Sequence, residues 1–174
     1  MVGNIERQIR SGAVDWIQIR EKDLEARELV TLARRVVHLA ASAAVKILIN
    51  SRMDVALAAG AHGVHLPSAT PAPSEYRRVA PASFLIGVST HSVAEVKRAE
   101  ALGADYVVLG PVFDPLSKKT DQVALGLGEF AVCAGAAGIP VIALGGITTA
   151  KFAACARAGA AGVAGITLFQ GSGK

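Results

Sequence analysis

Short apolar runs alternate along the chain with longer stretches in which apolar side chains recur at helical spacing. The runs predict strands near residues 15–20, 46–50, 63–66, 84–89, 105–110, 140–145 and 162–167. They are continuous rather than alternating, which is typical of parallel strands covered on both faces. The intervening periodicity predicts helices over residues 5–11, 25–41, 54–59, 92–102, 127–137 and 148–158. A repeated strand–helix unit favours an α/β fold with a parallel sheet.

The joints between helix and strand share one sequence pattern. SGAVDWIQI, AGAHGVHL, LGADYVVL and AGAAGVAGI each place a glycine before a short spacer and an apolar strand. These glycines suit the left-handed position that ends a helix, and they are Gly12, Gly60, Gly103 and Gly159. No G-x-G-x-x-G follows the first strand, which weakens the case for a nucleotide-binding sheet. We therefore predict one domain, residues 1–174, with the fold of a (β/α)8 TIM barrel.

Seven predicted strands are one fewer than this barrel needs. The chain begins within a predicted helix and stops just after the last predicted strand, so the first strand and the last helix are apparently lacking. Such a barrel would leave two unpaired strand edges. A truncated chain, an open or swapped assembly, and an unrecognised eighth strand would each account for the difference.

Composition excludes several classes of protein. Hydrophobic residues make up 52% and charged residues 18%, which excludes a disordered chain. No apolar run approaches the roughly 18 residues that a membrane span needs, and Glu6, Arg7 and Arg10 interrupt any signal peptide, so a cytoplasmic protein is expected. The net charge is +4 and no basic stripe with interleaved aromatics occurs, which argues against a nucleic-acid partner. Cys133 and Cys155 fit no metal spacing and are expected in the core.

Polar residues follow the predicted strands, at the end where barrels of this kind place their ligand sites. Gln18, Arg20 and Lys22 follow the first strand and share one side by alternation, so they can converge on one anion. Asn50 ends the second strand, where it either caps the next helix or holds a ligand. His65 on the third strand is expected to be a satisfied core residue more often than a catalyst.

The later strands lead into candidate anion sites. The fourth ends in GVSTH, which contains Ser89, and the fifth leads into GPVFDPLSKKTD, where Ser117 and Lys118 can grip a phosphate. The sixth ends in LGGIT, and the backbone N–H groups near Gly146 predict an anion cradle. GITLF, residues 165–169, is the candidate second half of that cradle.

The order of these motifs resembles the thiamine phosphate synthase/TenI family. QIREK, INSR, GVHLP, GVSTH, GADYVVLGPVF, SKK and IALGGIT carry the resemblance, which spans nearly the whole chain. It implies a (β/α)8 barrel and a transferase of thiamin biosynthesis. The reaction would join hydroxymethylpyrimidine diphosphate to thiazole phosphate and release pyrophosphate, with Mg2+. The implied partners are these phosphorylated small molecules, and a homo-oligomer is possible.

The resemblance also implies roles for individual residues. The pyrimidine diphosphate would be held by Gln18, Arg20, Lys22, Asn50, Ser89 and Lys118. The cations among them, Arg20, Lys22 and Lys118, would be catalytic because they stabilise the departing diphosphate. The thiazole phosphate would be met by Ser117, Gly146, Ile166 and Thr167.

The family's metal ligands are absent from this sequence. Family synthases bind Mg2+ through two aspartates, whose positions are Ser51 and Thr70 here, and hydroxyls are poor substitutes for carboxylates toward this ion. No metal ligand is therefore predicted, and Mg2+ would arrive, if at all, with the diphosphate. The TenI branch also lacks these aspartates, but the histidine of its thiazole tautomerases falls at Pro111. A tautomerase using His65 or His91, and a catalytically silent barrel that binds thiamin precursors, are the alternatives.

Overall fold

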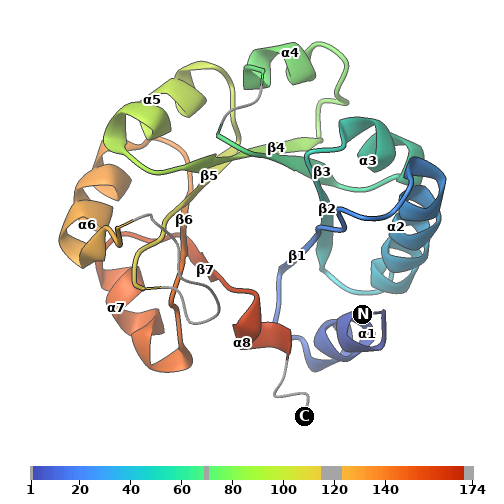
Figure 1. Ribbon diagram of the computed structural model, residues 1–174, viewed down its shortest axis with the longest axis horizontal. Coiled ribbons are helices and arrows are strands. Elements are labelled where there is room, and N and C mark those ends of the chain that lie inside the picture. The colour runs from blue at the N-terminus through green and yellow to red at the C-terminus, as the bar shows by residue number, and fades with distance from the viewer. Residues whose placement is uncertain (1, 69–70, 115–122, 171–174) are drawn as a thin grey trace. The chain divides into compact units, whose positions relative to one another are not determined.

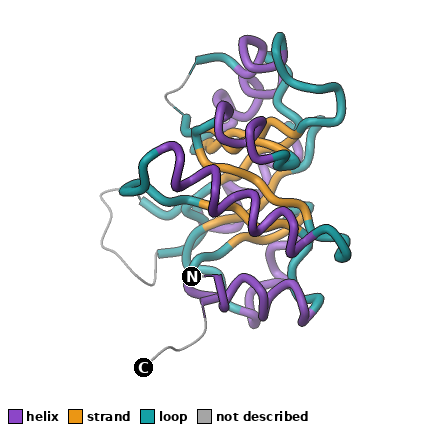
Figure 2. The backbone as a smooth tube through the Cα atoms, turned by 90° about the vertical axis from the view of Figure 1, so that its right-hand side faces the viewer, coloured by secondary structure: helices purple, strands orange, loops and turns teal. Residues whose placement is uncertain are grey.

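The computed structural model describes residues 2–68, 71–114 and 123–170. It contains seven parallel strands that alternate with helices, an α/β TIM-like arrangement. The strands are β1 (Trp16–Ile19), β2 (Lys46–Asn50), β3 (Gly63–Leu66), β4 (Leu85–Thr90), β5 (Tyr106–Leu109), β6 (Val141–Leu144) and β7 (Gly162–Ala164). The helices are α1 (Val2–Ser11), α2 (Ala26–Ala40), α3 (Met53–Ala59), α4 (Pro73–Arg77), α5 (Val93–Ala101), α6 (Gly126–Ala136), η1 (Thr149–Lys151), α7 (Phe152–Arg157) and α8 (Thr167–Gln170). The alternation can be followed in Figures 1 and 2.

The first of two compact units runs to Pro67 and includes Glu75–Ile86. Strands β1, β2 and β3 pair in parallel and in chain order, with Ile17 opposite Ile47 and Ile49 opposite Val64. Helices α2 and α3 pack together beside these strands (Figure 1). Helix α2 begins with a capping box in which Glu25 and Glu28 satisfy each other's backbone N–H groups. Its buried stripe, which includes Val36, covers the fully buried Ile47 and Ile49 of β2 and forms the core of this unit.

The second unit contains Ser68–Ser74 and the chain from Gly87 onward. Strands β4 to β7 again pair in parallel and in chain order. Ser92 caps α5 by accepting a hydrogen bond from the backbone N–H of Glu95. The ring of Tyr106 on β5 fills the space beside Gly87 of β4, because a Cβ on Gly87 would lie 1.9 Å from Cζ of Tyr106. Cys133 and Cys155 are fully buried, which confirms their predicted place in the core.

All seven predicted strands form, with boundaries shifted by up to three residues. The four joint glycines have φ between 63° and 91°, which confirms their left-handed helix-ending role. Three local features differ from what the sequence led us to expect. The short α4 was not foreseen, residues 148–158 divide into η1 and α7, and the last strand ends at Ala164 because Thr167–Gln170 form α8. No helix among the described residues is long and apolar enough to cross a membrane.

Candidate active site at the carboxyl ends of the strands

Two predicted ligand residues, Gln18 and Asn50, are joined directly in the first unit. Gln18 pairs in register with Leu48, two residues before Asn50, so the two side chains leave the sheet on the same face. The Nε2 amide of Gln18 donates to Oδ1 of Asn50 over 2.8 Å. Gln18 is exposed and Asn50 half-buried, so the pair is within reach of a ligand.

Asn50 does not cap the following helix, which corrects one of the two roles expected for it. Helix α3 begins at Met53 with Arg52 at its N-cap and no capping side chain. Asn50 donates instead from Nδ2 to Oγ of Ser51 over 2.8 Å. Arg52 makes a bidentate contact with Asp54, at 2.9 and 2.6 Å. The hydrogen bond from Arg52 holds the pKa of the Asp54 carboxyl below its ordinary range.

Arg20 and Lys22 follow the Gln18 strand as exposed side chains. Ile19 between Gln18 and Arg20 is buried, which agrees with the alternation that the sequence predicts. Both cations therefore extend from the same strand end as the amide pair. Their convergence on one anion stays a prediction.

His65 on β3 is a core residue, as expected. Its side chain is only 4% exposed, and burial lowers its pKa from 6.5 to about 4. The ring is consequently neutral near pH 7. This property makes it poorly matched to acid/base chemistry at neutral pH.

In the second unit, candidate residues lie at the ends of β4 and β5. Ser89 is half-buried, whereas Thr90 is buried. His91 donates from Nδ1 to the carbonyl oxygen of Gly110 over 2.6 Å, and its backbone N–H donates to Oε2 of Glu95 over 2.8 Å. Because a carbonyl oxygen only accepts, the proton of the first contact lies on Nδ1.

The glycine pair after β6 packs tightly against the segment after β5. The backbone N–H of Phe113 donates to the oxygen of Gly145 over 3.1 Å. Gly146 has φ 58°, and a Cβ there would lie 2.3 Å from the backbone oxygen of Asp114. Only glycine fits this position, because both the backbone conformation and the space exclude a side chain.

Lys151 is a site feature that sequence reasoning missed. Its Nζ donates to the oxygen of Gly146 over 2.7 Å and lies 4.0 Å from the centroid of the Phe113 ring. The ammonium group thus joins the two segments through a hydrogen bond and a cation–π contact. The sequence feature that could have identified Lys151 is its position shortly after the glycine pair, in the helical segment η1.

The structure describes only some of the remaining predicted site residues. Leu144 and Ala164 are register partners, so Gly146 and Ile166, each two residues further, follow the same end of paired strands. Ile166 is 59% exposed. Thr167 begins α8, and its side chain is not described. Ser117, Lys118 and Thr70 lie outside the described residues.

The described residues do not fit the family's magnesium site. Among them, no group of three or more His, Cys, Asp or Glu side chains could hold a metal ion. Ser51 offers a neutral oxygen that already accepts a hydrogen bond from Asn50. A hard dication prefers carboxylates and phosphates to such a group.

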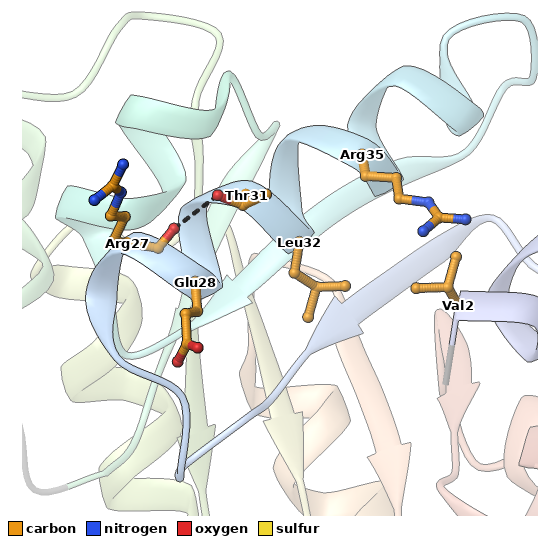
Figure 3. A pocket seen from close by; sticks show the side chains of 6 residues that line it. All are labelled: Val2, Arg27, Glu28, Thr31, Leu32 and Arg35. Carbon is orange, nitrogen blue, oxygen red and sulfur yellow. Dashed lines mark hydrogen bonds between the residues drawn. The ribbon is translucent and has the colours of Figure 1, made fainter.

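A cavity of about 400 Å3 lies between α1 and α2 (Figure 3). Its lining consists of Val2 from α1 and the α2 residues Arg27, Glu28, Thr31, Leu32 and Arg35. Thr31 is occupied by a hydrogen bond to the backbone oxygen of Arg27. None of the predicted site residues lines this cavity, so it does not define the site.

Comparisons with known proteins agree on one family. The family model described as thiamine monophosphate synthase matches residues 1–169. The chain is 41% identical to the thiamine-phosphate synthase of Methanoculleus marisnigri, over 98% of this chain and 81% of the relative. It is 36% identical to the thiamine-phosphate synthase of Roseiflexus castenholzii, over 99% of this chain and 75% of that one. The thiamine phosphate pyrophosphorylase structure from Pyrococcus furiosus matches with a TM-score of 0.84 and 30% identity, over 93% of this chain and 77% of that one.

Proposed function

Because the chain belongs to the thiamine monophosphate synthase family and is a transferase of the thiamine-phosphate synthase type, we propose that it joins hydroxymethylpyrimidine diphosphate to thiazole phosphate and releases pyrophosphate. The observation that carries the proposal is the hydrogen-bonded pair of Gln18 and Asn50 beside Arg20. An amide pair suits the polar edge of a pyrimidine, and the neighbouring cations suit its diphosphate. We also propose that the strands belong to a single (β/α)8 barrel domain, residues 1–174.

The proposed chemistry asks for fixed positive charge rather than for a strong base. The bond from the pyrimidine methylene carbon to the diphosphate oxygen breaks, and negative charge develops on the departing oxygens. Arg20, Lys22 and Lys118 would stabilise that charge in the transition state. The thiazole nitrogen then forms the new bond to the methylene carbon.

The thiazole phosphate would bind at the second unit's strand ends. Gly146 is buried against Phe113 and Asp114 and has no room for a side chain, which fixes the course of the backbone after β6. The backbone near Gly146, Ile166 and Thr167, with Ser117, would then meet the phosphate oxygens. Ser89 would contribute a hydroxyl to the pyrimidine diphosphate.

Magnesium has no step in this scheme, because the described residues do not fit it. We propose that any Mg2+ reaches the protein bound to the diphosphate, where the phosphate oxygens supply the charged ligands. Titration of Mg2+ into the free protein, followed by calorimetry, is then expected to give no binding at millimolar concentrations. Tight binding without diphosphate would contradict this.

The deciding experiment is a coupling assay with the purified protein and both substrates, with and without Mg2+. Thiamine phosphate and pyrophosphate should form in equal amounts. Arg20→Gln should lower kcat about a hundredfold, the scale of losing one charge-stabilising donor. Lys97→Gln, the same kind of charge loss on exposed α5, is the matched control. Absence of thiamine phosphate under every condition would overturn the proposal.

Thiazole tautomerisation is the second candidate, and His91 is the observation that favours it. Its Nδ1 donates to the carbonyl oxygen of Gly110, so Nε2 is the ring nitrogen that would exchange a proton with a ligand. If the chain is a tautomerase, His91→Gln should abolish isomerisation of thiazole phosphate carboxylate. If it is a synthase, the same variant should retain thiamine phosphate formation. A protein that binds both precursors but catalyses neither reaction would be the silent barrel.

A further inference from the structure

Ser51 holds a backbone conformation that serine does not favour. Among the described residues other than glycine, it has the one positive φ, at 62°. The backbone N–H of Ser51 donates to the carbonyl oxygen of His65 over 2.8 Å. That contact ties the end of β2 to β3 and keeps Ser51 in the left-handed region, whose cost the surrounding structure must offset.

The conformation of Ser51 brings its hydroxyl to the amide of Asn50. Nδ2 of Asn50 donates to Oγ of Ser51 over 2.8 Å. An amide has its nitrogen and oxygen on opposite sides, so Oδ1 of Asn50 faces the other way. There it accepts from Nε2 of Gln18 over 2.8 Å. Ser51 therefore holds the nitrogen side of the Asn50 amide, and Asn50 in turn holds one N–H of Gln18.

This arrangement decides what Gln18 can offer to a ligand. One N–H of Gln18 Nε2 is engaged with Asn50, which leaves Oε1 as the acceptor that Gln18 can present to an incoming donor group. Without an acceptor at position 51, the Asn50 amide could turn over and present Nδ2 to Gln18 instead. The side-chain amide of Gln18 would then turn over as well, and it would present its NH2 group to the ligand instead of Oε1.

We propose that Ser51 is a positioning residue that acts through Asn50 to make Gln18 present a hydrogen-bond acceptor to the pyrimidine substrate. The identity of the ligand rests on the proposed function. The hydrogen bonds from Gln18 to Asn50 and from Asn50 to Ser51 do not depend on that function. Ser51 would thus serve binding of the pyrimidine through its neutral oxygen, whether or not a metal ion takes part.

The first arm of the test observes the amides without any catalysis. Side-chain amide resonances of Asn50 and Gln18, recorded by 15N–1H NMR, should shift and broaden in Ser51→Gly. Glycine removes the hydroxyl yet adopts φ 62° without strain. Ser51→Asn should restore sharp resonances, since asparagine tolerates this conformation and supplies an acceptor oxygen. Ser42→Gly, the same change at an exposed position after α2, should leave them unaltered.

The second arm measures the consequence for the substrate. Ser51→Gly should raise KM for hydroxymethylpyrimidine diphosphate about fivefold, the scale of one misdirected hydrogen bond, and leave KM for thiazole phosphate unchanged. In an Asn50→Ala background the Ser51→Gly change should not alter KM further, because the Asn50 side chain that links Ser51 to Gln18 is absent. Ser51→Asn should recover KM.

The outcomes separate this proposal from the proposed function. Unchanged amide resonances in Ser51→Gly overturn the positioning role. Altered resonances with an unchanged KM for the pyrimidine diphosphate overturn its link to the substrate. If the wild type forms no thiamine phosphate, the proposed function fails, and calorimetric binding of the pyrimidine diphosphate to wild type and Ser51→Gly replaces the kinetic arm. Equal affinities there would count against the proposal.

Discussion

Protonation of His65 is expected to make the fold acid-labile over a defined pH range. Its pKa is about 4 in the folded protein, against an ordinary value of 6.5. Between these values the unfolded chain binds a proton that the folded chain does not. The free energy of unfolding is therefore fully retained above about pH 6.5 and falls as the pH drops toward 4.

The size of the effect follows from the two pKa values. A gap of about 2.5 at about 1.36 kcal/mol per unit corresponds to a loss of about 3 kcal/mol. The side chain is only 4% exposed, so solvent screening reduces this little. A loss of this size is a large part of the 5–15 kcal/mol that typically stabilises a folded protein.

Urea unfolding at pH 7, 6, 5 and 4 measures this loss, with His65→Gln as the perturbation. Glutamine keeps a hydrogen-bonding amide but does not titrate, so the variant should lose about 3 kcal/mol less than wild type across the range. His38→Gln, at an exposed position of α2, is the control and should follow wild type. If the free energy of unfolding falls with pH to the same extent in wild type and His65→Gln, the proposed role of His65 is refuted, whatever the variant's stability at pH 7. If His65→Gln does not fold, an NMR titration of the His65 ring in wild type should show no protonation above pH 5.

Three further predictions concern the second unit. Gly87→Ala should destabilise the fold by about 1–3 kcal/mol, because the new Cβ would lie 1.9 Å from the Tyr106 ring, and adding Tyr106→Leu should recover part of that loss in urea melts; no recovery would contradict the packing. Thr90→Val should raise the free energy of unfolding by about 1 kcal/mol, because the Thr90 hydroxyl is buried and has no partner among the described groups; a lower midpoint would reveal an unseen hydrogen bond. Lys151→Met should raise KM for thiazole phosphate more than KM for the pyrimidine diphosphate, since it releases Gly146 and Phe113, and equal changes would count against that role.

The strands were predictable because parallel strands that are covered on both faces consist of continuous apolar runs. The joint glycines added boundaries, since a left-handed helix end selects glycine strongly. The differences between prediction and structure lie in short segments, whose few residues do not show a clear helical or strand periodicity. Helix α4 is five residues long and begins with Pro73, too short for helical periodicity to show. Residues 162–167 read as a single apolar strand, although pairing with β6 ends at Ala164.

The candidate site was predictable in its residue types but not in its contacts. Gln18 and Asn50 lie 32 positions apart, and only the register of β1 on β2 brings them together. The sequence left Asn50 between a helix cap and a ligand, and its partners in the fold exclude the cap. The left-handed backbone at Ser51 could not be foreseen, because serine does not favour this conformation and its backbone partner, the carbonyl oxygen of His65, lies on another strand.

The buried cysteines provide a kinetic reporter of local opening. The chain has only Cys133 and Cys155, both lie in helices of the second unit, and burial raises the pKa of each thiol. A thiol reagent can therefore react only when α6 or α7 separates from the sheet, and the labelling rate follows the population of that open form. Because the first unit has no cysteine, the same measurement is silent about its unfolding. Comparing labelling with urea melts would show whether the two units open together or one at a time.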